Sequence, residues 1–506
     1  MTGTRNILRF IDGEELRELS GFDPTITILD WLRLDERRMG TKEGCAEGDC
    51  GACTVVIGTV RAGKMAYRAI NACIAPLASL DGRHLITIEH LKRGGKLHPV
   101  QQSMIDHHGS QCGFCTPGIV MSLFALWLNE NDVSDERIED ALAGNLCRCT
   151  GYVPIIAAGR DMFAKGTRAR KNWMGRVDAI AKRLARLQDD RSLEIVAGKR
   201  RFIAPATLDD LDDVYARYPG ATILAGATDV GLWITKDMRV LDTVIHLGRI
   251  GALEGVVEDD RTLVFGAMTS LFEAGLALGR MHPHLAELLR RFGGEQIRNA
   301  GTLGGNIANG SPIGDLPPAL IALGASVTLR QKDERRELPL EKFFLAYKRQ
   351  DRRPGEFVES VRVRKLDAAS LFHVSKVSKR FDEDISAVCG AFRLERDVDG
   401  RITEARLAYG GMAATPKRAS HAEARLLGRE WSEEAAGRAA AALERDFKPL
   451  DDWRASARYR MRCAQNLLRR FAIEICAPRI ETRIAGPLAR PHLIAAPAEA
   501  GTARGI

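Results

Sequence analysis

The cysteines constrain this chain more than any other feature, because eight of the eleven fall into two sets within the first 150 residues. Clustered thiols in a reducing compartment are more often metal ligands than disulfides. A length of 506 residues is too great for one hydrophobic core, so we expect several domains, with each cysteine set in a small N-terminal one. The first set is Cys45, Cys50, Cys53 and Cys73, and the second set is Cys112, Cys115, Cys147 and Cys149.

The first set has the spacing C-x4-C-x2-C followed by a remote fourth cysteine, which is typical of a plant-type [2Fe–2S] cluster. One loop can bring three thiolates together only if its backbone folds tightly, and Gly44, Gly48 and Gly51 give that freedom. A structural zinc site is the alternative. The glycines and the distant fourth ligand favour the iron–sulfur cluster.

The second set pairs C-x2-C with C-x-C, a less common pattern. Two adjacent helix termini can present these thiolates to one centre, because a helix N-terminus stabilises thiolate charge. Taken alone, the four cysteines also fit a zinc site. Their position directly after a ferredoxin-like set favours a second iron–sulfur cluster, and two clusters in one chain would serve to move single electrons.

Composition and charge indicate an ordinary soluble globular protein, with 45% hydrophobic and 28% charged residues. We find no apolar run long enough for a membrane span and no secretory signal, so we expect a cytoplasmic protein with no membrane partner. The net charge of +8 is concentrated between residues 160 and 201. Such a run can bind nucleic acid, but we expect a solvated linker helix and no nucleic-acid partner.

Local patterns predict six segments along the chain. Strands are expected at 7–11 (followed by a hairpin turn at Asp12-Gly13), 25–29, 54–57 and 67–70, and helices at 100–108, 119–130 and 134–142, the last capped by Ser134. A later strand is expected at 371–377 and a helix at 455–475. The segments are a β-rich ferredoxin domain (1–90), a helical cluster domain (91–165), a basic linker (166–192), an α/β domain (193–367), a C-terminal domain (368–478) and a disordered tail (479–506).

Two glycine-rich segments of the α/β domain could bind a phosphate-bearing ligand. A small-residue turn at 224–230 follows an expected strand at 221–224, and its backbone N–H groups could reach a pyrophosphate. The second segment, 301–315, is so dense in Gly, Asn and Ser that its entropic cost calls for a reason such as a bound flavin. Neither follows G-x-G-x-x-G, and the turn alone could equally be an ordinary strand–helix corner.

With these intervening residues, the two cysteine sets resemble the iron–sulfur part of the xanthine oxidase family of molybdenum hydroxylases, and the resemblance covers residues 5 to about 478. It implies an α+β multidomain chain. The domains would be a β-grasp plant-type ferredoxin domain, a helical-bundle [2Fe–2S] domain, a two-part α/β FAD-binding domain of the PCMH-like kind and a C-terminal α+β flavoprotein domain. By the same resemblance, Gln111 would contact the pterin cofactor of a catalytic partner.

The resemblance also implies a set of FAD-binding residues by position: Leu224, Gly226, Thr228, Asp229, Phe292, Thr302, Gly305, Asn306, Asn309, Asp315 and Lys376. Glu383 and Asp384 would lie on the loop where the electron acceptor docks, and neither is expected to be a catalytic residue in itself. The family often has an arginine where Phe381 stands and an aspartate at Glu383, so the electrostatics of this acceptor loop depart from the family pattern.

As a function, the resemblance implies the small, electron-transfer subunit of a two-chain bacterial xanthine dehydrogenase. A large molybdopterin-binding subunit would hydroxylate hypoxanthine or xanthine, and electrons would pass through the helical cluster, the ferredoxin-like cluster and FAD to NAD⁺, in an (αβ)₂ heterotetramer. The alternatives are the same role beside an aldehyde-, nicotinate- or CO-oxidising partner, or a redox-sensing cluster protein without turnover. Three cysteines match no ligand pattern and are expected to be incidental thiols: Cys389, Cys463 and Cys476.

Overall fold

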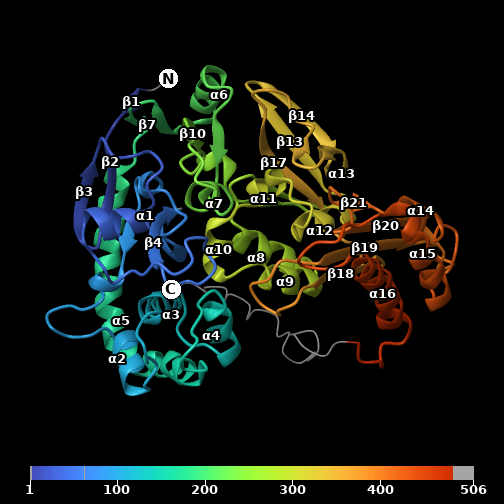
Figure 1. The fold of residues 1–506 in the computed structure, drawn as a ribbon, viewed down its shortest axis with the longest axis horizontal. Coiled ribbons are helices and arrows are strands. Elements are labelled where there is room, and N and C mark those ends of the chain that lie inside the picture. The colour runs from blue at the N-terminus through green and yellow to red at the C-terminus, as the bar shows by residue number, and fades with distance from the viewer. Residues whose placement is uncertain (1–2, 62, 483–506) are drawn as a thin grey trace, which may run out of the picture.

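The computed structural model describes residues 3–61 and 63–482. The chain forms successive parts, from the N-terminal sheet and helices at one end of the molecule, through the central α/β region, to the C-terminal sheet and its helices at the other (Figure 1). No helix in the described ranges is long and apolar enough to cross a membrane. Residues 483–506 of the predicted tail lie outside the described residues.

The first part is a five-stranded sheet in the order β3-β2-β6-β4-β5. Its strands are β2 (Leu8–Asp12), β3 (Glu15–Leu19), β4 (Thr54–Arg61), β5 (Lys64–Asn71) and β6 (His84–Ile86). The antiparallel pair β2–β3 confirms the hairpin predicted at Asp12-Gly13. The loop between residues 36 and 53 leads into β4, so the first three cysteines of the first set precede a buried strand.

The strand predicted at 25–29 is wrong. The alternating Thr and Ile residues there form one isolated bridge, Thr27 to Pro76, and a helical segment begins at α1 (Ile28–Asp30) and continues as a π-helical turn over Trp31–Asp35. The reason is a local cap, because the Thr27 hydroxyl oxygen accepts a hydrogen bond from the Asp30 backbone N–H at 3.0 Å.

The helical part consists of α2 (Pro99–Asp106), α3 (Thr116–Asn129), α4 (Asp135–Leu142) and α5 (Val153–Leu187), which confirms the three predicted helices and the Ser134 cap. The 35-residue α5 runs unbroken past residue 165, where the sequence predicts a domain boundary. Its basic side chains bind neighbouring carbonyls: the Arg170 guanidinium donates to Leu128 at 3.2 Å and Arg183 donates to Glu14 at 2.6 Å. The basic helix therefore joins the two cluster-bearing parts side by side.

The central region contains two five-stranded sheets. The first has the order β1-β7-β8-β10-β9, from β1 (Thr4–Arg5), β7 (Ser192–Ala197), β8 (Arg200–Ala204), β9 (Thr222–Leu224) and β10 (Thr243–His246), and carries α6 (Leu208–Arg217) and α7 (Val230–Thr235). The second has the order β11-β12-β17-β13-β14, from β11 (Val256–Glu258), β12 (Thr262–Gly266), β13 (Ser326–Gln331), β14 (Glu334–Pro339) and β17 (Phe357–Arg364).

Helices α8 (Leu271–Met281), α9 (Pro283–Arg290), α10 (Glu295–Ala300), α11 (Leu303–Asn309) and α12 (Leu316–Ala322) follow β12 and lie between the sheets of the central region and the C-terminal part (Figure 1). A short helix, α13 (Leu340–Phe343), leads into a hairpin of β15 (Phe344–Ala346) and β16 (Arg349–Gln350). The glycine-rich segment at 301–315 is therefore largely α11 and the turns on either side of it.

The C-terminal part is a four-stranded antiparallel sheet, β18 (Leu371–Val377), β19 (Val388–Arg396), β20 (Ile402–Gly410) and β21 (Lys417–Arg418). Helices α14 (Ser420–Ala424), α15 (Glu433–Asp446) and α16 (Ala457–Cys476) accompany it. The bounds of β18 match the predicted strand, and α16 confirms the predicted C-terminal helix. Phe392 and Tyr409, both fully buried, pack in the core that joins the sheet to the helices.

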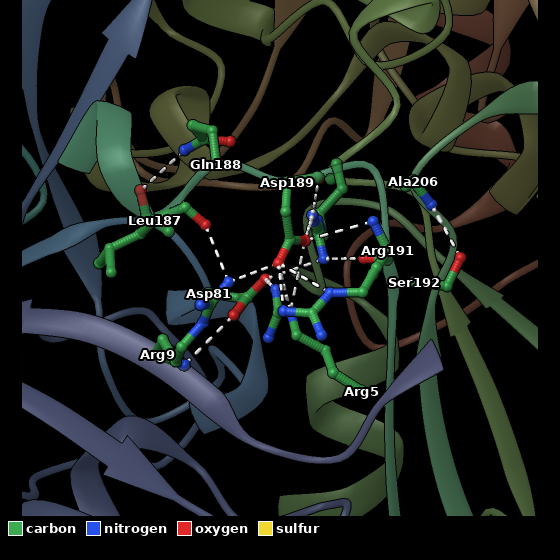
Figure 2. A network of polar contacts seen from close by, with 12 residues as sticks. Arg5, Arg9, Asp81, Leu187, Gln188, Asp189, Arg191, Ser192 and Ala206 are labelled. Atoms are coloured by element: carbon green, nitrogen blue, oxygen red, sulfur yellow. Dashed lines mark hydrogen bonds and ion pairs between the residues drawn. The ribbon is translucent and has the colours of Figure 1, made fainter. Parts of the chain in front are cut away.

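The N-terminal segment ties the ferredoxin-like part to the central region. Strand β1 pairs in parallel with β7, and not with the ferredoxin-like sheet. Behind this pairing lies an ion network in which Arg5 contacts Asp81 and the Arg9 guanidinium donates to Asp189 at 2.6 Å (Figure 2). Arg249 lies 3.2 Å from both Asp81 and Asp189. Strand β1 and the residues just after α5 are thereby fixed to the first sheet of the central region.

Candidate iron–sulfur and flavin sites

The four thiols of the first set converge in the structure. The sulfurs of Cys53 and Cys73 lie 3.3 Å apart, and Cys45 contacts the thiols of both Cys50 and Cys73. These contacts from Cys50 and Cys73 lower the pKa of Cys45 far below its usual value. Three backbone N–H groups also point at the Cys45 sulfur, those of Glu47, Asp49 and Cys50, at 3.3–3.5 Å. Such a thiolate-rich, N–H-lined pocket fits a [2Fe–2S] cluster, whose charge those donors would stabilise.

Two glycines shape the loop of the first set. A side chain at Gly44 would place its Cβ 2.8 Å from the Cys50 sulfur, so only glycine lets the thiol lie there. Gly51 has φ +68°, in the left-handed region, and a Cβ there would lie 2.0 Å from the carbonyl oxygen of Gly144. The loop is therefore pressed directly against the segment that leads to Cys147.

The thiols of the second set also meet, but at the surface. The sulfurs of Cys112 and Cys149 lie 3.6 Å apart and both residues are exposed, whereas Cys147 is buried and contacts Cys115. The Tyr152 hydroxyl accepts a hydrogen bond from the Cys147 backbone N–H at 2.7 Å, and the Thr150 hydroxyl lies 3.2 Å from the Cys147 sulfur. The arrangement fits a cluster with one side open to solvent. Gln111, next to Cys112, is exposed on that side.

Exposed apolar side chains neighbour the second set in the sequence. Phe114, Leu146 and Val153 are all exposed, with Val153 at 75% of its full surface. In the sequence, Phe114 lies between Cys112 and Cys115, and Leu146 directly precedes Cys147. Apolar side chains gathered around an open site are typical of a protein interface.

The two glycine-rich segments of the central region lie against one another. A Cβ at Gly226 would fall 1.9 Å from the carbonyl oxygen of Ala300, and Gly301 lies close to the Thr228 hydroxyl. Thr302 caps α11, because its hydroxyl oxygen accepts from the backbone N–H of Gly305 at 3.0 Å. Sequence patterns do not indicate this capping role for Thr302. The turn after Leu224 packs closely on the N-terminus of α11, an arrangement that fits a dinucleotide approaching the backbone.

Several polar side chains line this cradle. Asn309 hydrogen-bonds the Asp229 carboxylate, and the charge of Lys348 acts on the same group. The Oδ1 atom of Asn306 is buried and has no hydrogen-bond partner among the described residues, as expected for an atom that binds a ligand. These observations fit FAD. Phe292, at the end of α9, is half-buried against the core of the central region.

Asp315 and Lys376 form a buried ion pair between the central and C-terminal parts. The Lys376 Nζ donates to Asp315 at 2.8 Å and to the carbonyl of Arg291 at 3.2 Å. Ser386 donates its hydroxyl to the other Asp315 oxygen, and the thiol of Cys389 faces the Asp315 carbonyl oxygen at 3.5 Å. Burial raises the pKa of the Cys389 thiol well above its usual value, so this cysteine stays protonated. The pair joins two residues predicted for FAD on different parts of the chain.

The loop that carries Glu383 and Asp384 is held by Arg291. The Arg291 guanidinium donates to the carbonyl oxygens of Phe381 at 3.0 Å and Lys376 at 3.3 Å, and it stacks 4.4 Å from the Phe381 ring. The chain has Phe381 where the family often has an arginine. Two arginines, Arg290 in α9 and Arg291 at its C-terminal end, pack on the ring of Phe381.

The two acidic residues of this loop differ in environment. The backbone of Glu383 is left-handed, with φ +47°. Its carboxylate oxygen lies next to Gly294, at the start of α10, where an added Cβ would be only 2.6 Å from that oxygen. The Glu383 side chain therefore faces α10. Burial, followed by the charge of Asp49, raises its pKa to about 8. Asp384 accepts backbone hydrogen bonds from Arg380 and Ile385, at 2.7 and 2.9 Å. Asp384 thus shapes the loop.

A further group of potential ligand atoms lies between α9, β18 and α16. One potential ligand atom from each of three residues, His284, His373 and Glu474, lies within 4.8 Å of the other two. Glu474 pairs with His373 at 2.9 Å and accepts from the Arg470 guanidinium at 3.0 Å, and Ser375 bridges His373 to Arg470. With a guanidinium already beside this carboxylate, the group serves as an ion-pair network that fastens α16 to the sheet.

Sequence patterns miss the residues that join these sites. Asn145 and Gln296 are both buried, and their side chains lie 2.9 Å apart although they are 151 positions apart in the chain. The sequence marks Asn145 only as a break before Cys147, and Gln296 lies in no motif. The density of polar residues around 294–302 is the one signal that could have drawn attention to α10.

Three family models match successive parts of the chain. Residues 87–160 match the [2Fe-2S] binding domain, residues 196–365 the FAD binding domain in molybdopterin dehydrogenase, and residues 373–475 the CO dehydrogenase flavoprotein C-terminal domain. Among solved structures, the chain resembles carbon monoxide dehydrogenase from Hydrogenophaga pseudoflava with a TM-score of 0.51 and 28% identity, over 55% of this chain and 96% of that chain. A reconstituted CO dehydrogenase from Oligotropha carboxidovorans gives 0.51 and 26%, over 56% and 100%.

Curated relatives match over nearly the whole chain. Xanthine dehydrogenase from Emericella nidulans is 32% identical over 485 residues, which cover 85% of this chain and 36% of the relative. Xanthine dehydrogenase/oxidase from Rattus norvegicus is 32% identical over 492 residues, which cover 88% and 37%. The chain thus spans somewhat more than a third of the length of these relatives. Together with the converging thiols and the glycine-rich cradle, these matches show that the chain belongs to the xanthine oxidase family of molybdenum hydroxylases, as an iron–sulfur and FAD-binding module.

Proposed function

We propose that this chain is the electron-transfer subunit of a xanthine dehydrogenase, with two [2Fe–2S] clusters and one FAD. A separate large subunit would bind the molybdopterin and hydroxylate hypoxanthine or xanthine, and NAD⁺ would accept the electrons, in a cytoplasmic (αβ)₂ heterotetramer. The observation that carries the proposal is the convergence of the thiols in both cysteine sets, with the most accessible thiols partly buried in the first set and exposed in the second. The likeness of the whole chain to xanthine dehydrogenases supports the choice of substrate.

The residues of the chain have distinct parts in this proposal. The eight cysteines of the two sets would hold the clusters, which supply one-electron steps, while FAD supplies the change to two-electron chemistry. Backbone N–H groups around Cys45 would stabilise the added negative charge. The predicted FAD residues would bind the flavin across the 224–229 turn, α11 and the Asp315–Lys376 pair. Arg291 would keep the Phe381–Asp384 loop in place where NAD⁺ arrives.

The exposed apolar side chains around the second set would bind the large subunit. Val153 offers a test of this surface, because it is exposed, apolar and close to Cys149 without being a ligand. We expect Val153→Asp to abolish co-purification of the two subunits while the iron content is unchanged. Val398→Asp is the matched control, since this valine is also exposed and lies in the turn between β19 and β20, in the C-terminal part. Equal retention of the large subunit by both variants would contradict this interface.

The whole function is tested on the co-purified complex by metal and flavin analysis and by an anaerobic visible spectrum before and after xanthine. We expect about four irons per chain, as two [2Fe–2S] clusters require, one FAD, and bleaching on addition of xanthine. Zinc in place of iron, or a chain without flavin, would refute the electron-transfer role.

A second candidate keeps the electron-transfer role and changes the partner's substrate. The flavoprotein C-terminal match and the solved CO dehydrogenases favour a carbon monoxide-oxidising partner over an aldehyde- or nicotinate-oxidising one. Bleaching of the complex by carbon monoxide and not by xanthine would establish this candidate. The substrate is chosen in the partner chain, so the cluster and flavin sites are the same in both.

A further inference from the structure

The three parts of the chain meet at four buried polar side chains, which we call the polar junction: Thr54 from β4, Ser122 from α3, Asn145 from the loop before Cys147, and Gln296 from α10. The Gln296 amide nitrogen lies 2.9 Å from Asn145 Oδ1, 3.0 Å from the Ser122 hydroxyl and 3.4 Å from the Thr54 hydroxyl. Ser122 also donates to Asn145 Oδ1, at 2.7 Å. Buried polar groups that are hydrogen-bonded in this way fix their elements in one arrangement.

Asn145 connects the loops that carry the two cysteine sets. Its side-chain N–H₂ donates to the carbonyl oxygen of Gly51 at 3.0 Å, and the next residue, Leu146, donates its backbone N–H to the carbonyl oxygen of Cys50 at 3.0 Å. Cys50 belongs to the first set, and Leu146 is bonded directly to Cys147 of the second. Two parallel hydrogen bonds therefore hold a ligand of one set in register with a ligand of the other.

Gln296 and Ser122 together set which way the Asn145 amide points. An amide has one acceptor oxygen and one donor nitrogen, so donors placed at its oxygen force its N–H₂ to the opposite side. Here Ser122 and Gln296 both donate to the oxygen, and the N–H₂ is left facing Gly51. The Gln296 oxygen lies so close to Gly144 that a Cβ added there would be 2.2 Å away, so this packing requires glycine at position 144.

Helix α10, which carries Gln296, belongs to the region matched by the FAD-binding domain. The same helix contacts the ferredoxin-like sheet through Asn299, whose side chain donates to the carbonyl oxygen of Ala69 at 3.0 Å. Helix α10 thus contacts the loop before Cys147 through Gln296 and the edge strand β5 of the ferredoxin-like sheet through Asn299.

We propose that Gln296 is a positioning residue that sets the coupling between the two cysteine-bound centres, so that the flavin-binding part governs how fast an electron passes from the second set to the first. This inference rests on the proposed function. The eight cysteines would hold the two centres, which would supply one-electron chemistry; a single electron passed from the centre of the second set to that of the first would need no bond broken and no proton exchanged. Gln296 touches neither sulfur set and acts through Asn145 and the Leu146–Cys50 hydrogen bond.

The test compares Gln296→Met with Asn299→Ala in the full, cofactor-loaded chain. Methionine keeps the volume of glutamine but cannot donate to Asn145, while Asn299→Ala removes a hydrogen bond made by the same helix away from the cysteine loops. The first measurement is the low-temperature EPR spectrum of the fully reduced chain, in which two neighbouring reduced clusters split each other's signals. The second is the rate of electron redistribution between the clusters after a pulse of photoreduction, and the third is hydrogen exchange at the Leu146 amide.

We expect Gln296→Met to change the splitting, to raise exchange at Leu146 and to slow redistribution by about tenfold, since loss of a buried positioning hydrogen bond misplaces the two centres. Asn299→Ala should retain the wild-type splitting and rate. Gln296→Leu also removes the donor to Asn145, so it should behave like Gln296→Met if that variant does not fold.

Wild-type splitting and rate in both Gln296 variants, with full iron content, would overturn the inference and leave the electron-transfer role intact. Loss of rate in Asn299→Ala equal to that in Gln296→Met would also overturn it, because the effect would then belong to helix α10 as a whole. A wild-type chain that holds no iron would instead refute the proposed function, and the two failures are therefore distinguishable.

Discussion

In both cysteine sets four thiols meet, and the sets differ in their most accessible members: Cys45 and Cys50 are partly buried in the first set, whereas Cys112 and Cys149 are exposed in the second. In the first set, Cys53 and Cys73 are only 2% and 3% exposed, and backbone N–H groups surround Cys45. In the second set, Cys112 and Cys149 are exposed. Enclosure protects a cluster from solvent and lets fixed dipoles tune it, while an open side allows a partner to approach. Under the proposed function, this difference would place the first set inside the electron path and the second at its entrance.

Replacing one ligand in each set should give the largest effects and should separate the two surroundings. We expect Cys53→Ser to lose about two irons, as loss of one [2Fe–2S] cluster requires, and to lower Tm strongly, because Cys53 is also part of a hydrophobic core. Cys149→Ser should lose as much iron with a smaller change in Tm, because its side chain lies at the surface. Iron analysis and thermal melting measure both, and equal changes in Tm would contradict the contrast.

Two glycines with positive φ provide the next comparison, one in each cysteine loop. Gly51→Ala meets both a left-handed backbone and the Gly144 carbonyl oxygen, so it should destabilise the chain by about 3 kcal/mol and weaken cluster retention. Gly113→Ala has φ +82° but nothing within 4 Å, so only the backbone cost of about 1 kcal/mol applies. Denaturant unfolding of the two variants measures the difference. A larger loss for Gly113→Ala would show that the loops are not packed as described.

The acidic loop offers a smaller, pH-dependent comparison. Burial raises the pKa of Glu383 to about 8 from 4.5, so the folded chain keeps a proton that the unfolded chain releases, and stability falls as pH rises through this window. Glu383→Gln should therefore gain Tm relative to wild type between about pH 4.5 and 8. A difference in Tm that is constant with pH would mean that Glu383 is not buried against α10.

Asp384 is the matched control for this measurement. Burial by itself raises the pKa of Asp384. The backbone N–H of Arg380 and neighbouring donors outweigh this effect and hold the pKa of Asp384 below its usual value. A lowered pKa stabilises the fold above the ordinary carboxyl pKa, and this stabilisation is lost as pH falls. Asp384→Asn should accordingly lower Tm at neutral pH and approach wild type in acid, which is the reverse of the Glu383→Gln trend.

Sequence patterns predict what is local and fail where the chain meets itself over long distances. The division of the cysteines into two sets could be predicted from their spacing in the sequence. The Ser134 cap and the strand at 371–377 could be predicted because they depend on neighbouring residues. The strand predicted at 25–29 is wrong because alternating Thr and Ile also occur where Thr27 caps a helical turn. Pairing of β1 with β7 and contact between Asn145 and Gln296 follow from tertiary packing, which no local spacing encodes.

The contrast between an enclosed and an open cluster is tested most directly by EPR of the reduced chain with a soluble relaxing agent, such as chelated dysprosium. The agent speeds the relaxation of a paramagnetic centre only if it can approach closely. We expect two cluster signals, with faster relaxation of the second-set signal and little change in the first; Cys149→Ser should remove the sensitive one. Equal sensitivity of both signals, or greater sensitivity of the first, would contradict the order of the electron path.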